Sequence, residues 1–337
     1  MTVETETGPT GPDLEADDSV SPKKPRRAGR SACFIVFVLA IAGALAGWLG
    51  NLWIAFDVFA QFSLHFWLIA GAFALGFLMP VARVLTAITA LVIGLLVIGA
   101  LPHYKAASGG TGDIQAPAGH RIVRLMSFNS WLHNGNVEAL AREIERNDPD
   151  ILLMFEFGPE KRALKERLRA RYAYQDDCSH LEHCFMAVFS KYPIADFESH
   201  GAWTGPPMVR ATLGRELGGL TVIGTHTIRF PYLRAQLTQL GELGDLVRKL
   251  SGPRIVAGDF NATPSSRMLA IFQGRSLLRR LDGFLPTWPA RWQLPQLAID
   301  HIFASEEVKS VEDVRIAGNA GSDHFPLVVR VAVPVSP

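Results

Sequence analysis

Long uncharged apolar segments near the N-terminus are the feature that most limits how this chain can fold. Between Ser31 and Ala82 the only formally charged residue is Asp57, and none occurs between Val84 and Tyr104. An apolar stretch of about 20 residues is long enough for a helix to cross the hydrocarbon core of a membrane. We therefore expect three transmembrane helices within residues 32–103, with spans near Ala32–Phe56, Phe62–Met79 and Val84–Leu101.

The first apolar segment has a second interpretation, because a cleaved signal peptide also combines basic residues with an apolar run. Two further apolar segments follow it directly, and this favours a membrane-spanning helix. The basic segment Lys23–Arg30 precedes the first span, and Arg83 lies between the second and the third. Basic flanks stay in the cytoplasm. We therefore expect a multi-pass protein of the cell (inner or plasma) membrane, with a cytoplasmic N-terminus and everything after Leu101 outside.

Composition divides the chain into four parts. Residues 1–31 begin with a polar tail that is almost free of apolar side chains, as is typical of a disordered segment. The transmembrane region occupies residues 32–103, and a linker rich in Gly and Ala follows at 104–118. Residues 119–334 are more polar and have the ordinary length of one globular domain.

Charge argues against nucleic acid as a partner. The chain has 33 Lys and Arg against 32 Asp and Glu, with a formal net charge of +1. Proteins that bind nucleic acid normally carry a clearly basic face. The balanced charge therefore gives no support for such a face.

Cys178 and Cys184 lie close together in the domain that we expect outside the cell membrane. Two neighbouring cysteines in an oxidising compartment favour a disulfide. Two alternatives stay open: a pair of reduced thiols, and a metal site that includes the intervening His180 and His183.

Residues 119–334 alternate predicted strands with predicted helices. Apolar residues recur with helical spacing in Val137–Arg146, and a second helix is expected over Leu233–Leu250. The predicted strands are Ile122–Phe128, Ile151–Phe155, Phe185–Phe189, Leu220–Gly224, Ile255–Ala257, Ala298–Phe303 and Phe325–Val331. This alternation predicts an α/β fold with a largely buried sheet.

Polar side chains gather at the ends of these predicted strands. In the stretch RIVAGDFNATP, an apolar strand ends at Gly258, and Asp259 and Asn261 follow. Residues two apart on a strand face the same side, which would bring the two side chains together; an Asp/Asn turn is the alternative. The other strand-end residues are Asn129, Glu156, His226, Asp300, Asp323 and His324. Ligands of α/β proteins bind at strand ends, so these residues predict a site.

This ordered set resembles the endonuclease/exonuclease/phosphatase superfamily, which has the DNase I-like fold. The resemblance rests on GDFN (258–261), IDHIF (299–303) and SDHFP (322–326), together with the preceding polar residues, and it covers the domain at 119–334. It implies a four-layer α/β/β/α sandwich that hydrolyses phosphoesters with Mg²⁺, or with Mn²⁺ in its place. Phe155 stands where a Gln often precedes the metal-binding Glu, and Thr227 stands where a Leu often follows the His.

The resemblance also implies which residues bind the metal and the phosphate. Mg²⁺ prefers hard oxygen ligands, and Asn129, Glu156 and Asp323 would supply them. His226 would bind the phosphate. Arg210 is a further candidate for a phosphate contact, and a solvated strand arginine is the alternative.

The remaining residues of the set would perform the chemistry. Asp259 would orient or deprotonate the attacking water, and Asn261 would donate its amide to a phosphate oxygen. His324 would act as the acid or base, and Asp300 would hold its ring; a salt bridge at the strand edge is the alternative for Asp300. His301 is expected to point the other way.

Three spans followed by such a domain resemble the VanJ-type glycopeptide-resistance proteins, whose implied substrate is undecaprenyl pyrophosphate. We therefore expect a membrane-anchored phosphoesterase whose partners are the lipid bilayer and a membrane-borne phosphoester. An exported nuclease and a scaffold without catalytic activity are the alternatives. The balanced charge argues against the nuclease, and the complete set of polar residues argues against the scaffold.

Overall fold

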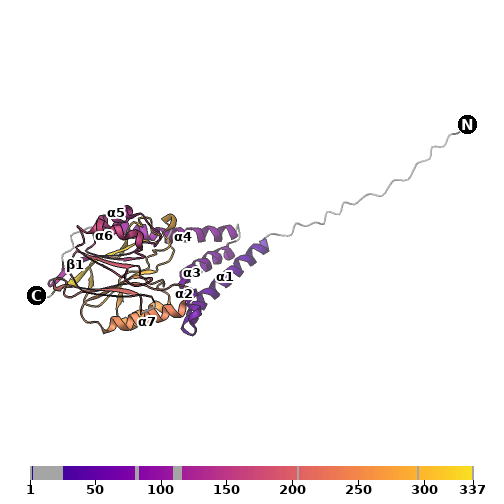
Figure 1. The fold of residues 1–337 in the computed structure, drawn as a ribbon. Coiled ribbons are helices and arrows are strands. Elements are labelled where there is room, and N and C mark those ends of the chain that lie inside the picture. Colours follow the sequence, from indigo (N-terminus) through magenta and orange to yellow (C-terminus); the bar gives the residue numbers. More distant parts are fainter. Residues whose placement is uncertain are drawn as a thin grey trace.

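The structure, a computed structural model, describes residues 2, 26–79, 83–108, 116–202, 205–293 and 296–335. An N-terminal group of helices extends from one end of an α/β domain (Figure 1). Residues 1 and 3–25 of the expected tail lie outside the described residues, as do residues 109–115 of the expected linker.

The N-terminal region contains α1 (Arg26–Trp48), the short α2 (Asp57–Gln61), α3 (Ser63–Leu78) and α4 (Arg83–Ser108). Within the described part, Ala28–Asn51 and Arg83–Pro102 are each long and apolar enough to cross a membrane. Ile54–Gln61 and Ser63–Leu78 pass this test only together, and they meet at an angle of 57°. The region therefore holds two candidate spans, or up to three if the bent pair is one span.

The boundaries of these helices differ from the expected ones in two places. The first expected span reached Phe56, but α1 ends at Trp48, and two short 3-10 helices (Leu49–Asn51 and Ile54–Phe56) lead into α2. The last helix continues to Ser108, into the segment expected to be a linker. The charged Asp57 directly follows Phe56, yet α1 ends eight residues earlier, and Pro102 directly follows Leu101, yet α4 continues through it.

The α/β domain contains two sheets in the part of the chain that the structure describes. The first has the order β11-β13-β1-β2-β4-β3, with β12 paired to β13, and the second has the order β5-β6-β7-β8-β10-β9. Strands of the first sheet are β1 (His120–Asn129), β2 (Ile151–Phe155), β3 (Tyr174–Asp177), β4 (Met186–Ser190), β11 (Lys309–Ser310), β12 (Arg315–Ile316) and β13 (Leu327–Pro334). Strands of the second are β5 (Ile194–His200), β6 (Met208–Leu213), β7 (Thr221–His226), β8 (Arg254–Asp259), β9 (Arg279–Arg280) and β10 (Asp300–Ala304).

Alternating side chains divide the domain into layers. On β2, Leu153 and Phe155 join the core between the two sheets, whereas Leu152 and Met154 face the opposite way. Helices α5 (Val137–Asn147) and α6 (Arg162–Leu168) cover this outer face of the first sheet. Helices α7 (Leu233–Lys249) and α8 (Arg267–Ser276) cover the outer face of the second. The result is the expected α/β/β/α sandwich, and Figure 1 shows α5 and α6 on one side of the strands and α7 on the other.

Each apolar strand predicted from the sequence exists, with shifts of a few residues at its ends. Several strands that sequence reasoning missed are polar or very short, such as β3 with the sequence YQDD and β5 with IADFESH, and these two lie at sheet edges, where apolar residues are not required. Strand β6, with the sequence MVRATL, was also missed, although it lies inside the second sheet between β5 and β7; Arg210 and Thr212 interrupt its apolar run.

Cys178 and Cys184 form a disulfide, and both side chains lie in the core between the sheets. This excludes the reduced thiols and the Cys/His metal site for the structure described.

Candidate functional site

The strand directions bring the polar strand-end residues to one edge of the sandwich. Strands β1 and β2 are parallel, and so are β7 and β8. Their carboxyl ends therefore carry Asn129, Glu156, His226 and Asp259 to the same edge. Strand β10 is antiparallel to β8, so it begins where β8 ends, and Asp300 lies opposite Asp259 in the register.

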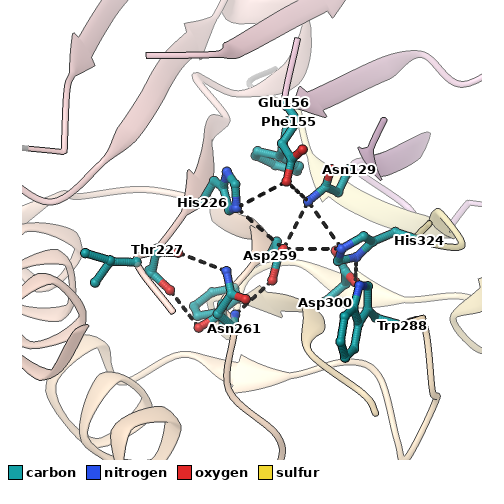
Figure 2. A network of polar contacts seen from close by, with 12 residues as sticks. Asn129, Phe155, Glu156, His226, Thr227, Asp259, Asn261, Trp288, Asp300 and His324 are labelled. Carbon is teal, nitrogen blue, oxygen red and sulfur yellow. Dashed lines mark hydrogen bonds and ion pairs between the residues drawn. The ribbon is translucent and has the colours of Figure 1, made fainter. Parts of the chain in front are cut away.

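His324 enters this group just before β13, which is antiparallel to β1. Figure 2 shows the side chains of both sheets converging around Asp259.

His324 is held by a carboxylate on each side. Its Nδ1 lies 2.8 Å from Asp300 Oδ2, and its Nε2 lies 3.7 Å from Asp259 Oδ2. Asp300 Oδ2 also accepts a 2.6 Å hydrogen bond from the hydroxyl of Thr287, which fixes the carboxylate. Burial by itself would lower the pKa of His324, but Asp300 and Asp259 raise it to about 9. The ring is therefore protonated at neutral pH in this arrangement.

Asp259 stands at the centre of the site and is almost completely buried, with 1% of its surface exposed. Its Oδ2 accepts a 3.0 Å hydrogen bond from Asn129 Nδ2, and it lies 3.6 Å from His226 Nε2. Burial and the charge of Asp300 raise the pKa of Asp259 above its usual value. A carboxyl group with a raised pKa is better able to take up a proton.

The segment after β8 satisfies both interpretations that the sequence left open. Asp259 Oδ1 accepts a 2.8 Å hydrogen bond from the backbone N–H of Asn261, which is an Asx turn. Asn261 has a left-handed backbone conformation with φ of 47°, so the strand does not continue to it. Both side chains nevertheless line the same cleft, and Phe260 between them is buried beneath the second sheet. One amide N–H of Asn261 donates to the carbonyl of Thr227 at 2.9 Å, which leaves the second N–H for a ligand.

The surroundings of Glu156 favour its ionised form. Burial works to raise its pKa, but His226, the N–H of Leu132 and the amide of Asn129 together hold the pKa below its usual value. Leu132 N–H donates to Glu156 Oε2 at 2.6 Å, and Asn129 Nδ2 donates to Oε1 at 3.2 Å. Glu156 also has a left-handed backbone, with φ of 54°, which turns its side chain back toward the strand end.

Lys161 is a supporting residue that sequence reasoning missed. Its buried ammonium donates to three backbone carbonyls, those of Trp131, Leu132 and Glu156, at 2.8, 3.0 and 2.9 Å. These bonds hold the loop after β1 against the turn after β2, and so position the Leu132 N–H that binds Glu156. A lysine in a polar segment carries no sequence signal for such a role. Thr287, which holds Asp300, was missed for the same reason.

Three expected details of the site need correction or refinement. Arg210 does not face the site: its guanidinium pairs with Asp196 at 3.2 Å and with Glu198 at 2.5 Å, both on β5, and it is not among the residues that line the cleft. Its neighbours on β6, Val209 and Ala211, point into the core between the two sheets. Arg210 therefore faces the opposite side of the second sheet. Arg210 is therefore a strand arginine away from the site, as in the alternative interpretation, but it is ion-paired and only 20% exposed rather than solvated.

Asn129 directs its amide nitrogen, rather than the expected oxygen, at the site. Its Oδ1 accepts from the backbone N–H of Trp131 at 3.1 Å, and its Nδ2 donates to Glu156 and Asp259 and lies 3.5 Å from His324 Nε2. The carboxylates of Glu156 and Asp259 attract the N–H groups of the Asn129 amide, and the backbone N–H of Trp131 donates to its oxygen.

Asp323 lies near Trp288, which donates to its Oδ2 at 3.2 Å. Its Oδ1 is buried without a hydrogen-bond partner, so this oxygen is available to a ligand.

His301 points away from the site, as expected. Its Nδ1 lies 2.7 Å from Asp282 Oδ2 and its Nε2 lies 2.9 Å from the carbonyl of Ala262, and the ring is fully buried. Adjacent residues of β10 therefore place two His–Asp pairs on opposite faces of the second sheet.

The site opens into a cleft of about 780 Å³. The polar residues Glu156, His226, Asp259, Asn261 and His324 line its floor. Apolar and aromatic residues surround them, among them Trp131, Ile228, Phe230, Leu233, Trp288 and Leu297. Three further lining residues, Val58, Gln61 and Phe62, come from the N-terminal helical region.

The sequence profile of the endonuclease/exonuclease/phosphatase family matches residues 126–324, a range that includes every residue of this site. The chain belongs to this family. Endonucleases, exonucleases and phosphatases all hydrolyse phosphate esters, so membership makes the chain a phosphoester hydrolase by family.

Relatives of known structure share the fold of this family member. A humanized D. rerio TDP2 with 14 mutations matches with a TM-score of 0.52 and 16% identity, over 62% of this chain and 98% of that one. An endonuclease/exonuclease/phosphatase from Beutenbergia cavernae matches with a TM-score of 0.50 and 18% identity, over 63% of this chain and 72% of that one. At these identities the likeness concerns the fold alone.

A curated relative is the UPF0294 protein VP2298 of Vibrio parahaemolyticus, which is 32% identical over 112 residues. The match covers 33% of this chain and 39% of the relative, so the chain spans about two fifths of that protein's length.

The residues of the site fit a divalent cation. Asp259, Asp300 and His324 have ligand atoms within 4.8 Å of one another, and Glu156 adds a third carboxylate nearby. An anionic phosphate can approach three carboxylates only if positive charge offsets them. His324 Nδ1 is occupied by Asp300, which leaves carboxylate oxygens as the accessible hard ligands. Glu156 is the acid among these that is most accessible from the cleft, with 23% of its side chain exposed.

Proposed function

We propose that this protein is a membrane-anchored phosphoester hydrolase that depends on Mg²⁺, or on Mn²⁺ in its place, and acts on a phosphate or pyrophosphate carried by a lipid. Undecaprenyl pyrophosphate, the substrate implied by the resemblance to VanJ-type proteins, is the candidate within this class. The observation that carries the proposal is the composition of the cleft: the acid and histidine cluster of the catalytic domain shares it with residues of the apolar N-terminal helices.

The chain's own residues can perform both halves of a hydrolysis. Asp259, whose pKa is raised, would orient the attacking water and accept its proton. His324 holds a proton at neutral pH and would donate it to the leaving oxygen. Asp300 and Thr287 keep the ring in the orientation that this transfer needs. His226 and the free N–H of Asn261 would contact phosphate oxygens.

Glu156 would hold the cation, with Asp323 as a further oxygen ligand and Asn129 after rotation of its amide. A cation bound there would offset the charge that develops on the phosphate oxygens.

We also propose that the catalytic domain lies outside the cytoplasm. Arg30 stacks on the ring of Phe77 with its guanidinium carbon 4.6 Å from the ring centre, and Arg83 donates to the carbonyl of Met79. The start of α1, the end of α3 and the start of α4 therefore share one end of the helical region. The catalytic domain lies at the other end (Figure 1). Basic residues favour the cytoplasmic side, which supports an extracytoplasmic catalytic domain.

The test is an assay of the full-length protein in liposomes with Mg²⁺, with Asp259→Ala as the inactive control. Undecaprenyl pyrophosphate, a phosphodiester lipid and DNA are offered as substrates in parallel. We expect release of phosphate from a lipid substrate and none with the control. Efficient degradation of DNA with the lipids untouched would instead establish the exported nuclease.

A further inference from the structure

The segment between α1 and α3 is joined to the catalytic domain through Asp57, the lone charged residue of the long apolar segment. Asp57 is fully buried, and its carboxylate accepts from the hydroxyl of Ser266 and from the backbone N–H of Arg267, both at 2.6 Å. Ser266 is the N-cap of α8, and Arg267 is its first residue. An acidic group at a helix N-terminus satisfies free N–H groups and the helix dipole. Asp57 therefore caps a helix that lies 209 residues later in the chain.

Two further bonds fix the same junction. Gln61 Oε1 accepts from the backbone N–H of Thr263 at 2.7 Å, and the guanidinium of Arg267 donates to the carbonyl of Gly50 at 2.7 Å. Ile54 packs against the core beneath the second sheet. Thr263 follows Asn261 by two residues, so the junction holds the loop that carries Asn261.

This attachment places α2 and the residue that follows it in the wall of the cleft. We use the name α2 wall for Val58, Gln61 and Phe62, the three residues of the helical region that line the cleft together with Asp259 and His324. Phe62 is 42% exposed, and together with Phe230, which is 60% exposed and lines the same cleft, it offers apolar surface beside the polar site. It directly precedes α3, the apolar helix that leads toward the membrane-spanning end of the region.

We propose that the α2 wall binds the hydrocarbon chain of the substrate where the chain leaves the phosphate. The inference rests on the proposed function and adds a residue-level binding site to it. A phosphate at Asp259 and His324 places the first carbons of its ester in the cleft, opposite Val58 and Phe62. From there the chain continues along α3 into the bilayer without crossing water. The N-terminal region is then part of the substrate-binding site as well as an anchor.

The test uses full-length protein and a series of prenyl diphosphates with short and long chains. The wild type should show a higher kcat/KM for the longer chains. Phe62→Ala should lower the ratio of long-chain to short-chain kcat/KM by about tenfold, the size expected when a large apolar contact is lost. Val58→Ala should lower it less, because fewer carbon atoms are removed.

Leu39→Ala is the matched control, because Leu39 lies on α1, is 65% exposed and does not line the cleft. It should keep the wild-type ratio. The ratio is insensitive to a partial loss of folded protein, which lowers both rates together. A prenyl diphosphate with a photoreactive chain should also label the wild-type peptide that contains Val58–Phe62.

Two results would overturn the inference in different ways. Hydrolysis of long-chain substrates with an unchanged ratio in Phe62→Ala, or labelling confined to other segments, would remove the α2 wall but leave the proposed function standing. A wild type that hydrolyses soluble phosphoesters but no lipid phosphate would overturn both.

Discussion

At the scale of single residues, the pair of His324 and Asp300 is the feature that separates a catalytic site from polar residues that only end strands or form turns. An isolated strand-end histidine is commonly structural, whereas this one has Asp300 at 2.8 Å on one nitrogen and Asp259 at 3.7 Å from the other. Because the two carboxylates belong to different strands, the ring is held in the cleft rather than free to turn.

The first prediction at this scale concerns turnover. His324→Ala and Asp259→Ala should each lower turnover at least ~100-fold, because each removes a group that transfers a proton. Circular dichroism should show that both variants keep the fold, since neither side chain belongs to an apolar core cluster. His301→Ala should not show this loss of turnover in its folded protein, because the His301 ring contacts Asp282 and the carbonyl of Ala262 away from the cleft. Well-folded His324→Ala protein with unchanged turnover would place the chemistry elsewhere.

The second prediction concerns pH. His324 has a folded-state pKa of about 9 against an ordinary value of 6.5, so folding favours its protonated form. This contribution to stability is fully present below about pH 6.5 and is lost as the pH rises through 9. In the presence of a chelator, the thermal unfolding midpoint of the wild type should therefore fall between these pH values. His324→Asn should show a smaller fall over the same range; equal falls would contradict the assignment.

At the scale of elements, strand β8 depends on a glycine at a point where β7 approaches closely. Gly258 has φ of 155°, and a Cβ there would lie 1.9 Å from the carbonyl oxygen of Thr225. Thr225 is its partner in the parallel register between β7 and β8. A side chain at position 258 must displace β7 or β8. His226 directly follows Thr225 on β7 and Asp259 directly follows Gly258 on β8, so one of these two site residues would move as well.

We therefore expect Gly258→Ala to lower the free energy of unfolding by about 3 kcal/mol or more, as backbone clashes in a core do. Activity should fall in the remaining folded protein as well. Gly274→Ala is the control, because no atom lies within 4 Å of a Cβ built there and the position is inside α8. Helix propensity predicts that this change is neutral or stabilising by up to ~1 kcal/mol. Equal stabilities of the two variants in thermal unfolding would refute the close approach.

At the scale of the whole molecule, the helical region and the catalytic domain share contacts as well as a chain connection. The capping of α8 by Asp57 brings the turn between α1 and α3 to the catalytic domain, whereas Arg30 and Arg83 lie at the opposite end. In the proposed membrane-anchored protein, the turn after α1 and the catalytic domain therefore lie on the same side.

This geometry leads to a prediction about topology. A reporter fused after Pro337 should be active only if it functions outside the cytoplasm. A reporter inserted after Met79, between α3 and α4, should be active only in a cytoplasmic form. A cytoplasmic signal from the fusion at Pro337 would contradict the proposed orientation.

The sequence by itself determined which polar residues stand at the strand ends and the class of the fold. Short continuous apolar runs predict buried strands, and polar residues that end such runs stand out against them. Asp259, Asn261, Asp300 and His324 were therefore identified from the order and spacing of their motifs. The disulfide of Cys178 and Cys184 was favoured for the same kind of reason, from local spacing and compartment.

Only the tertiary structure decided which long-range partners these residues have. The pairing of Arg210 with Asp196 and Glu198, the direction of the Asn129 amide and the support from Lys161 all depend on contacts between separate elements. Asp57 is the clearest case. Its charge was visible as an exception in an apolar sequence, but its role as the cap of α8 follows from a contact 209 residues away. No periodicity or motif encodes such a contact, because it arises from how the completed sandwich and the helices fit together.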